Sequence, residues 1–145
     1  MITFAQQAEI EEVVSKFENC AYDPKEFTHA HHLTVAACYL SSYSPEEARS
    51  RMRDNLLRFT AHHGVQAYHE TITQFWLRMT QVFLARCPES HDFRERLNAL
   101  IEHFPDKRII FTHYSESRLM SPGARAKWVE PDLKAIPQSG SSLDE

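Results

Sequence analysis

The residues best suited to chemistry are the histidines that lie just after Phe27. His29 and His32 are three positions apart, so on a helix they project from the same face. Apolar residues at helical spacing continue that face, namely Leu33, Ala36 and Leu40. We therefore expect His29 and His32 to point toward the core, whereas His31 is rotated toward a rim or solvent. Imidazole is a metal ligand and a base near neutral pH, so an inward pair suits metal binding or proton transfer.

A second cluster, in residues 68–76, adds a histidine and a carboxylate. His69 borders an apolar stripe at helical spacing, so it is also expected to point inward. Glu70 lies about 100° further around the helix, where a carboxylate could orient an imidazole or complete a metal shell. We predict that His29, His32 and His69 are metal ligands or acid–base groups, with Glu70 as a fourth ligand or general base. Three histidines and a carboxylate suit Zn, Fe, Ni or Mn.

Structural roles stay open for the same residues. Imidazoles at the edge of a core are often satisfied by backbone carbonyls, and an acid such as Glu70 near a helix start interacts well with the helix dipole. Residues 69–73 lack the second histidine of the zinc-protease helix, so peptide hydrolysis of that kind is not supported. The histidines therefore either form a site or hold helices together.

The C-terminal third offers two groups that could orient a substrate. Tyr114 and Arg125 lie in a polar stretch, residues 112–133, that could serve as a lid. An arginine can clamp a carboxylate or phosphate with two hydrogen bonds, so we expect Arg125 or Tyr114 to orient a small polar substrate. The alternative for Arg125 is a salt bridge with Glu130 or Asp132 that fixes the C-terminal segment.

Helical periodicity places the two histidine clusters on different helices. The first cluster falls in the opening turns of a helix expected over about 24–41, with Asp23 as its N-cap and Pro24 as its first residue. The second cluster begins a helix expected over about 66–86, the most apolar of the chain and therefore the expected centre of the fold. The site should lie between these two helices.

The rest of the chain is also expected to be helical. Further helices are predicted over about 4–19, 45–63 and 91–104 from their periodicity and their start and stop residues. Residues 107–115 contain β-branched side chains that allow a strand, but no partner strand is in sight, so we favour a short helix. Another short helix begins at Ser121-Pro122.

These elements predict an all-α fold. We expect a compact helical bundle of about five main helices plus short C-terminal helices. A single domain would cover residues 1–135, because no repeat or internal boundary is visible. Residues 136–145 would form a disordered tail.

Composition excludes several classes of function. Lys and Arg number 16 against 20 Asp and Glu, and no basic run could follow nucleic-acid phosphates, so no nucleic-acid partner is expected. The 3 glycines cannot form a phosphate-binding loop or a dinucleotide fingerprint, so no nucleotide cofactor is expected. No apolar run approaches the about 20 residues that cross a bilayer, and the 3 cysteines show no paired spacing. We expect a cytoplasmic protein without membrane contact.

Several of these residues form a set of motifs that resembles a group of small, largely uncharacterised bacterial helical proteins. The motifs are F-x-H-x-x-H-L at 27–33 and Y-H-E-T-x-T at 68–73, followed by Tyr114-Ser115, Ser121, Ala124-Arg125 and Pro131-Asp132-Leu133. The resemblance covers most of the chain from residue 27 onward. It implies that these positions matter and assigns no reaction.

Together the residues favour a small intracellular enzyme with a buried site between two helices. Metal-dependent chemistry on a small polar molecule is favoured over metal-free acid–base chemistry. One alternative is a non-catalytic module that binds a metal ion or a small ligand in the same place. The other is a buried histidine network that only holds the two helices together.

Overall fold

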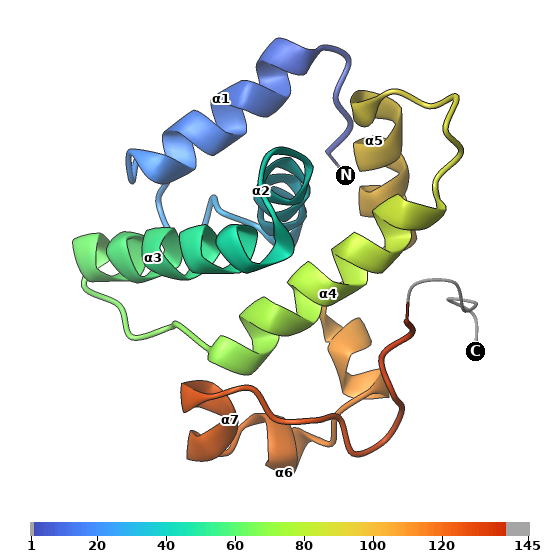
Figure 1. Cartoon of the computed structure of the whole chain (residues 1–145). Helices are drawn as coiled ribbons and strands as arrows, with labels where there is room; N and C mark the ends of the chain where they lie inside the picture. The colour runs from blue at the N-terminus through green and yellow to red at the C-terminus, as the bar shows by residue number, and fades with distance from the viewer. Residues whose placement is uncertain (1, 139–145) are drawn as a thin grey trace.

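The chain folds into helices joined by short loops. The computed structural model describes residues 2–138, and within that range it contains no strand, which confirms the expected all-α fold. The body consists of α1 (Gln7–Glu18), α2 (His29–Ser42), α3 (Pro45–His63), α4 (Glu70–Arg86) and α5 (Phe93–His103). The 3-10 helix η1 (Lys107–Thr112) and the short helices α6 (Glu116–Leu119) and α7 (Pro122–Ala126) follow (Figure 1). Most of the predicted tail, residues 139–145, lies outside the described residues.

α2 and α4 form the centre of the fold. α2 packs against α1, α3, α4 and α5, and α4 packs against α2, α3, α5 and α7. Figure 1 shows α4 crossing the molecule, with α6 and α7 below its first turns. Consecutive side chains of both central helices are buried, including Val35, Ala36 and Ala37 on α2 and Phe75, Trp76 and Leu77 on α4. A helix that is buried on several faces can carry polar groups toward more than one neighbour.

The start of α2 differs from the prediction. The helix begins at His29, and its N-cap is Thr28, whose backbone N–H donates to His31 Nδ1 at 3.1 Å. The prediction of a start at Asp23 and Pro24 is wrong, because residues 23–27 form a turn in which the Asp23 carbonyl accepts from the N–H groups of residues 26 and 27. His31 is therefore a capping residue at the rim of the helix.

The other helix boundaries follow local capping chemistry. α3 begins at Pro45 behind the N-cap Ser44 and ends at Gly64, whose φ of 67° is left-handed, as predicted. α4 begins at Glu70, later than expected, because residues 65–68 have no regular secondary structure and the N-cap His69 is extended. The N-cap of α5 is Asp92. Residues 107–112 form the 3-10 helix η1 in place of a strand, as favoured.

An aromatic cluster joins the N-terminal helices near the start of α2. Phe27 stacks on Phe17 of α1 with ring centroids 4.6 Å apart, and it contacts Phe59 of α3 at 5.4 Å. All three rings are buried. None of the helices within residues 2–138 is both long and apolar enough to cross a membrane.

Candidate functional site

His69 is the N-cap of α4, and both of its ring nitrogens are used. Nδ1 accepts a hydrogen bond from the backbone N–H of Ile72 at 3.2 Å. The proton is therefore on Nε2, which donates to the carbonyl of Leu119 at 2.7 Å. Burial lowers the pKa of His69, which favours the neutral ring that these two bonds require. His69 thus joins the start of α4 to the end of α6.

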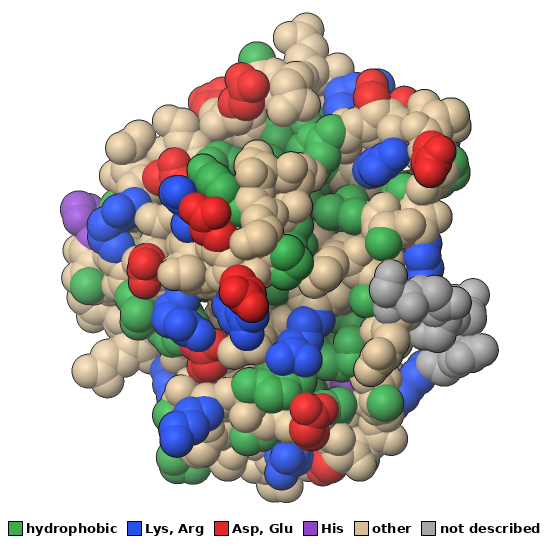
Figure 2. All heavy atoms as spheres, viewed as in Figure 1, with side chains coloured by type: hydrophobic (Ala, Val, Ile, Leu, Met, Phe, Trp, Pro, Cys, Tyr) green, Lys and Arg blue, Asp and Glu red, His purple; other side chains and the backbone are tan. Residues whose placement is uncertain are grey.

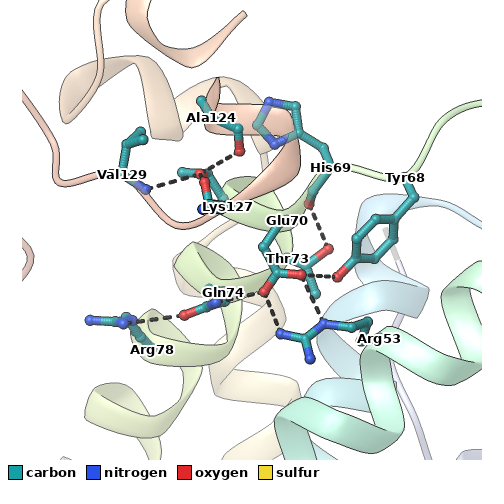
Figure 3. A network of polar contacts seen from close by, with 11 residues as sticks. Arg53, Tyr68, His69, Glu70, Thr73, Gln74, Arg78, Ala124, Lys127 and Val129 are labelled. Carbon is teal, nitrogen blue, oxygen red and sulfur yellow. Dashed lines mark hydrogen bonds and ion pairs between the residues drawn. The ribbon is translucent and has the colours of Figure 1, made fainter. Parts of the chain in front are cut away.

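Glu70 lies at the centre of a polar network between α3 and α4 (Figure 3). The Arg53 guanidinium donates to both of its oxygens, from Nε at 2.9 Å and from Nη2 at 2.8 Å. The Tyr68 hydroxyl donates to Oε1 at 2.6 Å, and Gln74 Nε2 donates to Oε2 at 2.5 Å. Burial alone raises the pKa of Glu70, but these hydrogen bonds outweigh it and lower the pKa to about 2.

This network decides what Glu70 is suited for. A carboxylate with a pKa of about 2 is a weak base at neutral pH. Four donor groups already occupy its two oxygens, so a metal ion or a substrate proton would have to displace them. Glu70 is therefore better suited to hold α3 against α4 than to act as a ligand or general base.

His29 also bonds to a backbone carbonyl. Its Nε2 lies 3.1 Å from the carbonyl oxygen of Phe104, at the end of α5, and donates to it. The ring meets Trp76 of α4 edge-on at 4.5 Å, and burial lowers its pKa. His29 therefore connects the first residue of α2 with α4 and α5, which is the structural role left open for it.

His32 differs because it faces a cavity. A hollow of about 240 Å³ lies between α2, α3 and the start of α4, and we call it the α2–α4 cavity. Its walls include Phe27, Leu56, Phe59 and Ile72, together with the polar residues His32, Tyr68, His69 and Thr73. Within the described part of the chain, the His32 ring contacts Phe27 at 4.7 Å and has no hydrogen-bond partner. Burial, with the nearby charges of His29 and His31, lowers its pKa to about 4.

The structure brings together two of the three predicted metal ligands. His32 and His69 line the same cavity, whereas His29 is not part of its lining. Both nitrogens of His69 are bonded to the backbone, so neither has a free lone pair for a metal. No group of three or more His, Cys, Asp or Glu side chains in residues 2–138 is placed to hold a metal ion. The Zn, Fe, Ni or Mn site stays a prediction that would require these rings to move.

Neither Tyr114 nor Arg125 lines the α2–α4 cavity. Tyr114 is fully buried, its hydroxyl donates to the Val129 carbonyl at 2.6 Å, and burial raises its pKa. Arg125 is exposed and donates to the carbonyl of Gln66, and no salt bridge to Glu130 or Asp132 joins it. Both side chains fasten the C-terminal segment, and their substrate-orienting role stays a prediction.

Sequence reasoning missed Thr71 and Arg53. The Thr71 hydroxyl lies 2.6 Å from the Ala124 carbonyl and 2.8 Å from the Lys127 carbonyl, and it accepts the Val129 N–H at 3.2 Å. Figure 3 shows the partners Ala124, Lys127 and Val129 above the Glu70 network. Thr71 belongs to the Y-H-E-T-x-T motif, which was the available signal. No sequence signal pointed to Arg53, because nothing in its own segment indicates a partner 17 positions away.

No family model, no curated protein and no solved structure matches this chain. The resemblance to small bacterial helical proteins therefore stays an expectation. The features that indicate a function are the α2–α4 cavity and the residues around it.

Proposed function

We propose that the protein binds a small, mostly apolar molecule with one hydrogen-bonding group in the α2–α4 cavity. The observation that carries the proposal is the His32 ring, which lines this cavity without a hydrogen-bond partner in the described part of the chain. The ring is half-buried, so without a ligand its nitrogens are left to water. A ligand that bonds to His32 would therefore satisfy a group that the fold itself leaves open.

The walls of the cavity define the body of such a ligand. Phe27, Phe59, Leu56 and Ile72 provide aromatic and aliphatic contact surface. The volume of about 240 Å³ exceeds the roughly 150 Å³ cavity that accommodates benzene, and it falls below the roughly 300 Å³ at which sites for drug-sized ligands begin. The size and the walls suit a single substituted ring.

The charge state of His32 defines the polar group of the ligand. With a pKa of about 4, the ring is neutral at physiological pH and offers one N–H donor and one lone pair. A neutral hydroxyl can bond to either nitrogen. A cationic ligand would find no carboxylate to balance it, because Glu70 is not part of the lining and is already paired with Arg53.

The low pKa values of the candidate bases favour binding over acid–base catalysis. An efficient general base has a pKa near the working pH. The pKa values of His32, about 4, and Glu70, about 2, both lie well below neutrality. The non-catalytic ligand-binding interpretation of the sequence is therefore the one that these values support.

The test compares phenol with benzene, which have the same ring and differ by one hydroxyl. Amide chemical-shift changes in NMR titrations give both dissociation constants. We expect both to bind in the cavity, and phenol to bind about tenfold more tightly through its bond to His32. In His32→Leu the apolar walls remain, so benzene should still bind and the preference for phenol should disappear.

A matched variant controls for the loss of a histidine. His62 is exposed on α3 and does not line the cavity, so His62→Leu should keep the preference for phenol. The proposal fails if neither ligand shows saturable shifts around the cavity. It also fails if His32→Leu, with an unchanged far-ultraviolet spectrum, binds phenol as the wild type does.

A further inference from the structure

Two arginines line a second hollow, on the other side of α4 from His69. This hollow has a volume of about 210 Å³ and lies between the end of α2, the beginning of α3 and the middle of α4. Its polar lining consists of Arg49, Gln74, Arg78 and Gln81. Figure 2 shows Lys and Arg side chains spread across the middle of the face where α3 and α4 meet. We call this feature the Arg49–Arg78 hollow.

Arg49 differs from the other arginines in residues 2–138 because it has neither an ion pair nor a hydrogen bond. The ion pairs among residues 2–138 are Arg51 with Glu47, Arg53 with Glu70, and Arg108 with Asp106. Arg49 makes no hydrogen bond or ion pair within the same residues, although Glu46 lies three positions before it on α3. In a chain with a net charge of −4, a half-buried guanidinium without a partner stands out as a place for an external anion.

Arg78 is held in place by contacts that leave most of its donors open. Its guanidinium stacks over the Trp128 ring at 3.8 Å, and Nη2 donates to Gln74 Oε1 at 3.2 Å. Its other N–H groups have no partner in the described range. An arginine that stacks through its flat face still presents the edge of its guanidinium, which is the edge that binds a carboxylate or phosphate with two hydrogen bonds.

The remaining walls define what the anion is attached to. Leu40, Pro45 and Leu77 provide apolar surface beside the two arginines. Inorganic ions gain nothing from such surface, whereas a short hydrocarbon chain is stabilised by leaving water. Gln74 holds the Arg78 side chain in position, because it bonds to both Arg78 and Glu70.

We infer that the Arg49–Arg78 hollow binds a small organic anion, with a carboxylate or phosphate held between the two guanidinium groups and a short apolar chain against Leu40 and Leu77. The hollow shares no lining residue with the α2–α4 cavity. This site is therefore independent of the proposed function, and the chain would hold a neutral ligand and an anionic ligand on different sides of α4.

Isothermal titration with three probes tests the anion site. Hexanoate and butyl phosphate carry the two headgroups on an apolar chain, and 1-hexanol carries the chain without a charge. We expect saturable binding of hexanoate or butyl phosphate, and the tighter of the two identifies the headgroup. Hexanol should bind at least tenfold more weakly, because hydrogen bonds to charged groups contribute about that factor or more. Equal binding of hexanol would overturn the inference.

Variants identify the two arginines as the binding groups. Arg49→Gln removes no hydrogen bond or ion pair within residues 2–138, so it should fold normally and bind the anion about tenfold more weakly. Arg78→Gln should have the same effect, with its thermal unfolding measured in parallel because it also loses the Trp128 stacking.

Two controls complete the design. Arg51→Gln removes the same charge from the same helix, outside the hollow, and should leave the affinity unchanged within twofold. His32→Leu should also leave it unchanged. If Arg49→Gln binds the anion as tightly as the wild type, or no more weakly than Arg51→Gln does, the inference is overturned.

Discussion

His69 and His32 line the same cavity from two neighbouring helices, but their surroundings are opposite. Both nitrogens of His69 are bonded to the backbone, to Ile72 and to Leu119. The His32 ring has no hydrogen-bond partner among residues 2–138, and it contacts the Phe27 ring. The comparison teaches that histidines of one cluster can have different roles. A ring whose two nitrogens are both hydrogen-bonded fixes the local geometry, whereas a ring with open nitrogens is available to the proposed ligand.

The largest expected change comes from acid. The pKa values of His29, His32 and His69 are all lowered by burial in the folded protein, whereas an unfolded chain takes up protons near pH 6.5. Their contribution to stability is therefore complete above about pH 6.5 and is lost as the pH falls toward 4. The free energy of unfolding, measured with urea, should drop by several kcal/mol between these values.

Glu70 acts in the same direction in a lower window. Its pKa is lowered from 4.5 to about 2, so its contribution is present above pH 4.5 and is lost as the pH falls toward 2. Because the two pH ranges differ, the loss of stability caused by the histidines can be measured apart from the loss caused by Glu70. In His32→Leu the slope between pH 6.5 and 4 should become shallower, and a slope identical to that of the wild type would contradict the lowered pKa of His32.

The second largest loss of stability is expected for Glu70→Ala, which removes a side chain whose hydrogen bonds are all made within the fold. The substitution leaves Arg53, Tyr68 and Gln74 without their shared acceptor, and we expect a loss of about 3 kcal/mol in urea unfolding. Glu47→Ala is the matched control, because its pair with Arg51 is exposed and one helical turn apart. That variant should lose about 0.5 kcal/mol or less. Equal losses would mean that the Glu70 network does not hold α3 to α4.

The third prediction compares the two histidines directly. His69→Ala should lose about 2 kcal/mol, because the N-cap of α4 and the bond to Leu119 both disappear. His69→Asn should recover about 1 kcal/mol, because asparagine is a good N-cap. His32→Leu should cost less than His69→Ala in the same urea titrations. A larger loss in His32→Leu would show that the free ring is needed for the fold.

The smallest change in stability is expected at a buried hydroxyl group that, unlike the His32 ring, does not line a cavity. Thr80 is fully buried in α4, and its hydroxyl has no hydrogen-bond partner among residues 2–138. Thr80→Val keeps the shape and removes the unsatisfied oxygen, so thermal unfolding should show a gain of about 0.5–1 kcal/mol. A loss of stability would mean that the Thr80 hydroxyl is bonded in solution, and it would weaken the distinction drawn for His32.

Local signals in the sequence predicted much of the fold. α3 was placed correctly because Ser44-Pro45 and Gly64 act on their own neighbours. The start of α2 was misplaced because Pro24 fits a turn as well as a first helical position, and the Thr28–His31 capping bond is an uncommon one. The inward direction of His32 also follows from periodicity, which is a local property.

The partners of the site residues could not be predicted in the same way. Glu70 meets Arg53 only because α3 and α4 pack side by side, and packing geometry leaves no mark near either residue. His29 and His69 bond to the carbonyls of Phe104 and Leu119, and a carbonyl is present at every position of a chain. The sequence therefore indicated which side chains matter without indicating what they contact.

Those backbone acceptors have a consequence for how the chain tolerates mutation. His69 and Thr71 hold the C-terminal segment through the carbonyls of Leu119, Ala124 and Lys127. Any residue at these three positions would still present the acceptor, so Leu119 and Ala124 are constrained by packing and the exposed Lys127 hardly at all. The donors are side chains, so His69 and Thr71 cannot be replaced by most other residues without losing these bonds. A mutational scan should therefore find His69 and Thr71, about fifty positions earlier in the chain, far less tolerant of substitution than these three acceptor positions.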